Sequence, residues 1–69
     1  MIKKKPMETI RVGIVEDQKT INQSLVQSIE MYPSLDLAFN AFSAEEALDE
    51  LASSNLPPDV ILLLSLIHI

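Results

Sequence analysis

Cysteine and tryptophan are absent from this sequence of 69 residues, and glycine occurs once, at Gly13. Without cysteine no disulfide can stabilise the chain, although a domain of this size buries only about 60% of the surface that its unfolded form exposes. The lack of cysteine is also typical of a reducing compartment. A glycine-rich loop that cradles phosphates is excluded, because Gly13 lies inside an apolar stretch and no second glycine follows. With 48% hydrophobic residues, the sequence predicts one small folded domain with an aliphatic core.

Positive charge is scarce outside the N-terminus. Lys and Arg number five against ten Asp and Glu, and three of the five are Lys3, Lys4 and Lys5. Residues 8–69 therefore carry two positive and ten negative charges, a net charge of −8. Such an acidic body repels phosphate backbones and anionic membranes, so we expect neither nucleic acid nor a membrane as a partner of this segment. We expect residues 1–8 to be a flexible tail.

Long apolar runs are absent too. The longest, residues 60–69, has ten residues and includes Ser65 and His68, whereas about 20 are needed to cross a bilayer. Polar residues and a proline follow the lysine cluster where an export signal would need an apolar stretch. We therefore expect a soluble cytoplasmic protein.

The hydrophobic pattern predicts alternating strands and helices. Residues 10–15 are short, β-branched and almost continuously apolar, which is typical of a strand buried on both faces. Apolar residues at helical spacing follow over residues 21–29, and Pro33 ends that helix. Leu35, Leu37 and Phe39 then alternate with polar or small residues, which predicts a strand with one wetter side, at an edge of the sheet.

A second helix and a third strand complete this pattern. Residues 43–46 form an S-x-x-E capping box, in which Ser43 and Glu46 each satisfy a free backbone N–H group. The helix that begins there has an apolar face, expected to pack on the sheet, made of Ala44, Ala47, Leu48, Leu51 and Ala52. Residues 60–63 form a third, wholly apolar strand. The order βαβαβ predicts an α/β fold, a flavodoxin-like doubly wound parallel sheet truncated to three strands in the order 2-1-3.

In such a sheet, ligands bind where the carboxyl ends of the first and third strands meet, and Glu16 and Asp17 stand there. Two interpretations of this acidic pair are open. Acidic residues near a helix N-terminus complement the helix dipole and cap the helix. Alternatively, the two carboxylates bind Mg²⁺, a hard cation that takes one or two carboxylates and keeps several waters. The position at the switch point favours the metal.

Three segments, in this order and at this spacing, resemble successive landmarks of the receiver domain of response regulators. They are Ile10-Arg11-Val12-Gly13-Ile14-Val15-Glu16-Asp17, Ala44-Glu45-Glu46-Ala47-Leu48 and Pro58-Asp59-Val60-Ile61-Leu62-Leu63. The Tyr32-Pro33 turn and the segment after it resemble receivers of regulators that carry a C-terminal helix-turn-helix domain. The resemblance covers residues 9–63, which correspond to about the N-terminal half of a receiver domain.

The resemblance implies a phosphoacceptor in a two-component phosphorelay that regulates transcription. In that family an acidic pair and an aspartate at the end of the third strand hold Mg²⁺, and that aspartate takes a phosphoryl group from a histidine kinase or phosphotransfer protein. Carried over, Asp17 would be the direct Mg²⁺ ligand and Glu16 the second carboxylate, acting through water. Glu16 is a departure from the family's usual aspartate at this position. A DNA-binding output domain is implied beyond this segment.

A second departure falls at the acceptor position, where the sequence has Leu64. Leucine cannot be phosphorylated, and Asp59 precedes the third strand, at the end opposite the acidic pair. Residues 64–69, Leu-Ser-Leu-Ile-His-Ile, are what the string CTGTCTCTTATACACATC would encode, and this string resembles a transposon-end adapter used to prepare sequencing libraries. We therefore expect residues 64–69 to derive from an adapter and the natural sequence to depart after Leu63. The alternative is a real extension of the third strand in a degenerate receiver.

We expect this chain to be no enzyme and to lack phosphotransfer, because Thr20 and Ser65 are hydroxyls without an evident base and His68 has no partner. Two other functions stay open. A pseudo-receiver would be an interaction module that works without phosphorylation, and it requires Leu64 to be genuine. A fragment of a nucleotide-binding enzyme would share the βαβαβ order, but the phosphate loop is missing. As three strands alone, the chain should expose its third strand as an edge and be poorly soluble or partly unfolded.

Overall fold

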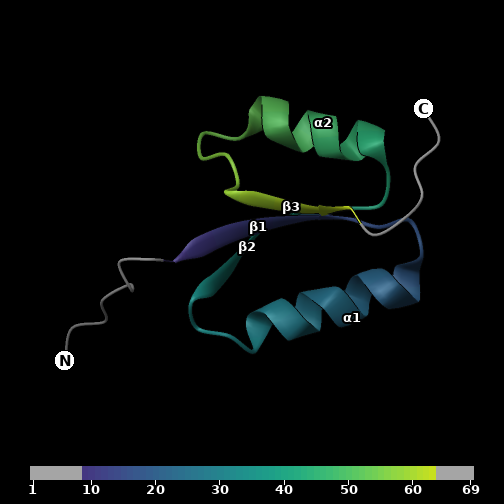
Figure 1. The fold of residues 1–69 in the computed structure, drawn as a ribbon. Coiled ribbons are helices and arrows are strands. Elements are labelled where there is room, and N and C mark those ends of the chain that lie inside the picture. The colour runs from purple at the N-terminus through teal and green to yellow at the C-terminus, as the bar shows by residue number, and fades with distance from the viewer. Residues whose placement is uncertain (1–8, 64–69) are drawn as a thin grey trace.

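A computed structural model describes residues 9–63, which form five elements (Figure 1). These are β1 (Ile10–Val15), α1 (Lys19–Glu30), β2 (Leu35–Ala41), α2 (Ala44–Ser53) and β3 (Val60–Leu63). All strand pairs are parallel, and the strand order is β2-β1-β3. The predicted α/β fold and the strand order 2-1-3 are therefore confirmed. The predicted tails, residues 1–8 and 64–69, lie outside the described residues.

The two helices cover opposite faces of the sheet (Figure 1), as expected from right-handed crossovers on either side of the central strand. Alternation along β1 divides the core accordingly. Val12 and Ile14 pack on the α1 side with Ile29, and Val15 packs on the α2 side with Ala47. Neither helix in residues 9–63 is long and apolar enough to cross a membrane.

A β-bulge in β2 changes which face its side chains occupy. Val12 pairs with Leu37 and Gly13 pairs with Phe39, so Ala38 is an extra residue in the ladder. Leu37 therefore packs on the α1 side, whereas Phe39 joins the α2-side cluster. The alternating pattern had placed Leu37 and Phe39 on the same face, and the bulge makes that prediction wrong for Phe39. The predicted edge position of β2 is confirmed.

Phe39 explains why a glycine lies in the middle of β1. A Cβ atom placed on Gly13 would lie 2.5 Å from Cζ and 2.7 Å from Cε2 of the Phe39 ring. Ordinary carbon–carbon contacts are about 3.5–4.0 Å long, so any other residue would collide with the ring. Gly13 therefore lets a buried aromatic ring lie across the central strand.

The predicted capping box starts α2, with one difference. The Ser43 hydroxyl accepts a hydrogen bond from the Glu46 N–H group at 3.1 Å. The Glu46 carboxylate accepts at 2.8 Å from the N–H group of Phe42, one residue before the N-cap. Both side chains thus satisfy free donors at the helix start, as the motif predicts.

The apolar face predicted for α2 contacts the sheet only in part. Ala47 is buried and Leu51 packs against it, but Leu48 is 64% exposed. The strand β3 is similarly open, because Leu63 is 59% exposed and only Leu62 joins a core cluster. The expected exposed edge at β3 is therefore present in the part of the chain that the structure describes.

Candidate functional site

The candidate site lies where the three strands end together. In the register of the sheet, Val15 pairs with Ala41 on one side and with Leu63 on the other, so the last residues of all three strands are level. Glu16 and Asp17 follow Val15 directly, at the carboxyl edge of the central strand. The predicted position of the acidic pair, at the switch point of a parallel sheet, is confirmed.

Glu16 is buried, with 2% of its surface exposed. Its backbone N–H group donates to the carbonyl oxygen of Ala41 at 3.0 Å, which extends the sheet by one hydrogen bond. Its carboxylate oxygen Oε2 accepts from the N–H group of Gln18 at 2.9 Å. Gln18 is the N-cap residue of α1 and makes no side-chain cap bond, so Glu16 satisfies a donor at this helix start. The capping interpretation therefore applies to Glu16.

Capping leaves chemical capacity for a cation. An ionised carboxylate has two oxygens and about four acceptor sites, and the bond to Gln18 uses one of them. Among residues 9–63, Glu16 has no ion-pair partner, and a buried anion without a counter-charge is costly. Asp17, which the receiver resemblance assigns as the direct ligand, is exposed to solvent. One buried and one exposed carboxylate thus follow each other at this edge, and oxygen ligands of this kind suit Mg²⁺.

Sequence reasoning missed Asn22, a residue of α1 that completes this edge. Its side chain is fully buried, and Nδ2 donates to the carbonyl oxygens of Glu16 at 3.0 Å and Ala41 at 3.1 Å. A signal was present in the helical spacing. Val26 and Ile29 lie four and seven residues further on, so Asn22 continues the buried stripe of α1 with a polar side chain.

A third carboxylate does not join the pair within residues 9–63, where no group of three His, Cys, Asp or Glu side chains is placed to hold a metal ion. The position at which the receiver resemblance requires an aspartate is that of Leu64, outside the described residues. Thr20 is an exposed residue of α1, and Ser65 and His68 also lie outside the described residues.

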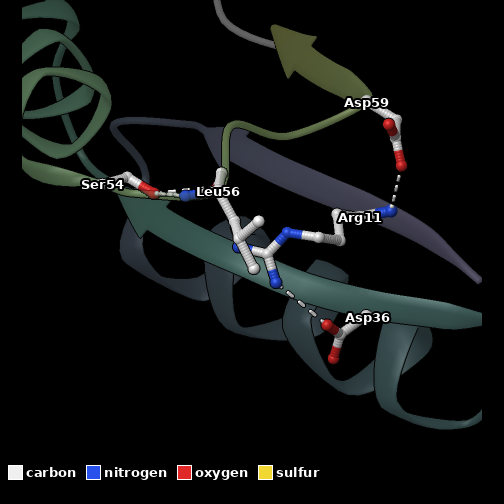
Figure 2. Close-up of polar contacts among 5 residues, drawn as sticks. All are labelled: Arg11, Asp36, Ser54, Leu56 and Asp59. Atoms are coloured by element: carbon white, nitrogen blue, oxygen red, sulfur yellow. Dashed lines mark hydrogen bonds and ion pairs between the residues drawn. The ribbon is translucent and has the colours of Figure 1, made fainter.

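Asp59 directly precedes β3, at the end of the parallel sheet opposite the acidic pair, as the sequence predicts. Figure 2 shows the polar contacts around it. Its carboxylate accepts from the Arg11 N–H group at 2.9 Å, and its own N–H group donates to the Arg11 carbonyl at 2.8 Å. The Arg11 guanidinium donates to Asp36 at 3.1 Å and to the carbonyl of Leu56 at 3.2 Å. This cluster joins the starts of β1 and β2 to the segment before β3, so Asp59 has a structural role far from the acidic pair.

Comparisons with known proteins give no relative for this chain: no protein-family model matches it, and neither does any curated protein or solved structure.

Proposed function

We propose that residues 9–63 are the N-terminal half of a response-regulator receiver domain, whose complete form accepts a phosphoryl group from a histidine kinase or phosphotransfer protein. One observation carries the proposal. Glu16 and Asp17 stand at the carboxyl edge of the central strand of a 2-1-3 parallel sheet, level with the end of β3. In a receiver this edge holds Mg²⁺, and the acceptor aspartate follows the third strand.

Charge explains why such an acceptor needs a cation. The carboxylate that attacks and the phosphoryl group that it receives are both anionic, so they repel each other as they approach. Mg²⁺, when bound, neutralises this charge and aligns the phosphoryl group with its attacking and leaving oxygens. On this proposal, Asp17 would hold the metal directly and Glu16 would do so through water, while Glu16 Oε2 caps α1.

A chain with Leu64 at the acceptor position would be inactive in phosphotransfer. The proposal therefore concerns the parent protein, in which phosphorylation would shift a surface that an output domain reads. We assign DNA binding to that output domain and not to this acidic segment, and we place the parent protein in the cytoplasm. The origin of residues 64–69 from a sequencing adapter belongs to the same proposal.

Leu64 itself favours one other function. If it is the natural residue, the chain is a pseudo-receiver, an interaction module that works without phosphorylation. Glu16 would then serve only as the cap of α1, through its bond to the Gln18 N–H group. The two functions differ in whether the Asp17 carboxylate affects phosphorylation.

Phosphorylation of the full-length product of the source gene tests the proposal. The protein is incubated with acetyl phosphate and Mg²⁺, and the phosphoryl group is detected by intact-protein mass spectrometry. We expect the wild type to be labelled, Asp17→Ala to lose labelling, and the control Asp49→Ala, an exposed carboxylate on α2, to keep it. Equal labelling of wild type and Asp17→Ala would refute the assigned role of Asp17, and an unlabelled wild type would favour the pseudo-receiver.

A further inference from the structure

Asn22 lies in the first turn of α1, and no part of its side chain is exposed. Asparagine is a poor residue for a helix, because its amide competes with the backbone for hydrogen bonds. It is also costly in a core unless its polar atoms are paired. The hydrogen bonds that Asn22 makes therefore have to offset the cost of burying its amide in a helix.

The bonds of Asn22 fix the backbone of Glu16 from one side. Nδ2 donates to the Glu16 carbonyl at 3.0 Å, while the Glu16 N–H group donates to the Ala41 carbonyl at 3.0 Å. Nδ2 also donates to that Ala41 carbonyl at 3.1 Å. Both peptide groups of Glu16 are thus held, and the ends of β1 and β2 are joined to the first turn of α1.

The planarity of the peptide bond extends this constraint to Asp17. The Glu16 carbonyl and the Cα atom of Asp17 belong to one planar unit, so the bond from Asn22 sets the direction in which Asp17 leaves the sheet. Metal ligands bind well when groups behind them fix their orientation. We infer that Asn22 is a positioning residue that holds Glu16 and Asp17 in place for a divalent cation.

Another atom of the same amide shows that this arrangement has a cost. Asn22 Oδ1 is buried and has no hydrogen-bond partner among residues 9–63. Leucine has the same branching and the same number of side-chain heavy atoms, carries no polar atom of its own and would extend the apolar stripe formed by Val26 and Ile29. Asn22 therefore holds the backbone of the acidic pair in place, whereas leucine at this position would bury more apolar surface but make none of these hydrogen bonds.

The inference rests on the proposed function, since it concerns the same metal site, but its first test needs no metal. Hydrogen exchange in the full-length product of the source gene, followed by NMR, compares wild type with Asn22→Leu. We expect the amides of Glu16 and Gln18 to exchange about five- to tenfold faster, the effect of one ordinary hydrogen bond, with no change in the centre of β1. The control is Asn40→Leu, because Asn40 also has a buried, unpaired Oδ1 atom, and it should leave both amides unchanged.

A second test measures the cation directly. Mn²⁺ accepts the same oxygen ligands as Mg²⁺ and broadens the NMR signals of nearby residues. We expect selective broadening at Glu16 and Asp17 in the wild type, a dissociation constant about 10- to 100-fold higher in Asn22→Leu, and no such change in Asn40→Leu. If leucine does not fit, Asn22→Ala removes the same bonds with a smaller side chain.

The outcomes separate the two proposals. In one outcome the wild type does not bind Mn²⁺, but Asn22→Leu still speeds exchange at Glu16 and Gln18 alone. Asn22 then positions the backbone of Glu16 and Asp17 as inferred, and the proposed metal site is wrong. If the wild type binds Mn²⁺ but Asn22→Leu binds it equally well, the inference about Asn22 is wrong and the metal site stands. Faster exchange throughout the chain would also overturn the inference, because it would show a general loss of stability.

Discussion

Substitution of Gly13 by alanine should destabilise the domain, although alanine usually stabilises a strand relative to glycine. The new Cβ atom would lie 2.5, 2.7 and 3.0 Å from three atoms of the Phe39 ring. The ring would have to retreat by about 1 Å to reach an ordinary contact distance. It has little room to do so, because Phe39 is 7% exposed and belongs to a cluster with Val15, Ala41 and Ala47.

The size of the effect follows from two opposing contributions. Overpacking of a core costs about 1–3 kcal/mol, whereas replacing glycine reduces the entropy of the unfolded chain and contributes about 0.4–1 kcal/mol of stability. We therefore expect Gly13→Ala to lower the free energy of unfolding by roughly 1–2 kcal/mol. A domain of this size has a total stability of only about 3–5 kcal/mol, so the loss would be large.

Urea denaturation followed by circular dichroism measures this effect, and a double-mutant cycle identifies its cause. Phe39→Leu shortens the side chain that faces Gly13, so it should cost less stability in the Gly13→Ala background than in the wild type. The coupling should be about 0.5–3 kcal/mol, as for other residues in contact. Strictly additive effects, or a Gly13→Ala variant more stable than the wild type, would refute the proposed contact.

Three further effects are expected from the described contacts. Ser43→Ala should lower the free energy of unfolding by about 1 kcal/mol, because the Glu46 N–H group loses its hydrogen-bond acceptor. Urea denaturation measures this effect, and an unchanged midpoint would contradict it. Asp59→Ala should lower the free energy of unfolding by about 0.5–1.5 kcal/mol and speed proteolysis between α2 and β3, because the Arg11 N–H group loses its acceptor. Equal cleavage of variant and wild type would argue against this. Ile61→Lys should reduce concentration-dependent association measured by light scattering, because it places a charge on the open edge strand β3. A wild type that stays monomeric and unfolds in one sharp transition would show that this edge does not associate.

The order of the elements was predictable because each has a strong hydrophobic period. Residues 10–15 and 60–63 are almost wholly apolar, and the stripe of α1 and the capping box of α2 mark the helices between them. Right-handed crossovers leave few arrangements open, and the edge character of residues 35–41 favoured the strand order 2-1-3. These local signals agree with the packing that the structure shows.

The features that were not predicted depend on pairing between distant residues. The bulge at Ala38 is set by the register between β1 and β2, and it moves Phe39 to the face opposite Leu37. The exposure of Leu48 depends on which parts of the sheet lie beneath α2, and its helical spacing alone gave the opposite result. A period-two or helical pattern carries no information about either contact.

The candidate site also has features that the sequence predicted and features that it did not. The place of Glu16 and Asp17 follows from the strand order, but the burial of Glu16 and its bond to the Gln18 N–H group do not. Asn22 was missed because a polar residue in an amphipathic helix usually faces solvent, whereas here it reaches two carbonyl groups at the ends of neighbouring strands. Only its position on the apolar stripe indicated otherwise.

Sequencing the genomic locus of the source with long reads across codon 64 tests the receiver proposal most directly. An aspartate codon after Leu63, with a reading frame that continues, is the predicted result. It would place the acceptor at the end of β3, level with the acidic pair, and assign residues 64–69 to an adapter. Genomic codons for Leu64 to Ile69 followed by a stop would contradict the phosphoacceptor function for this product and leave the interaction module in its place.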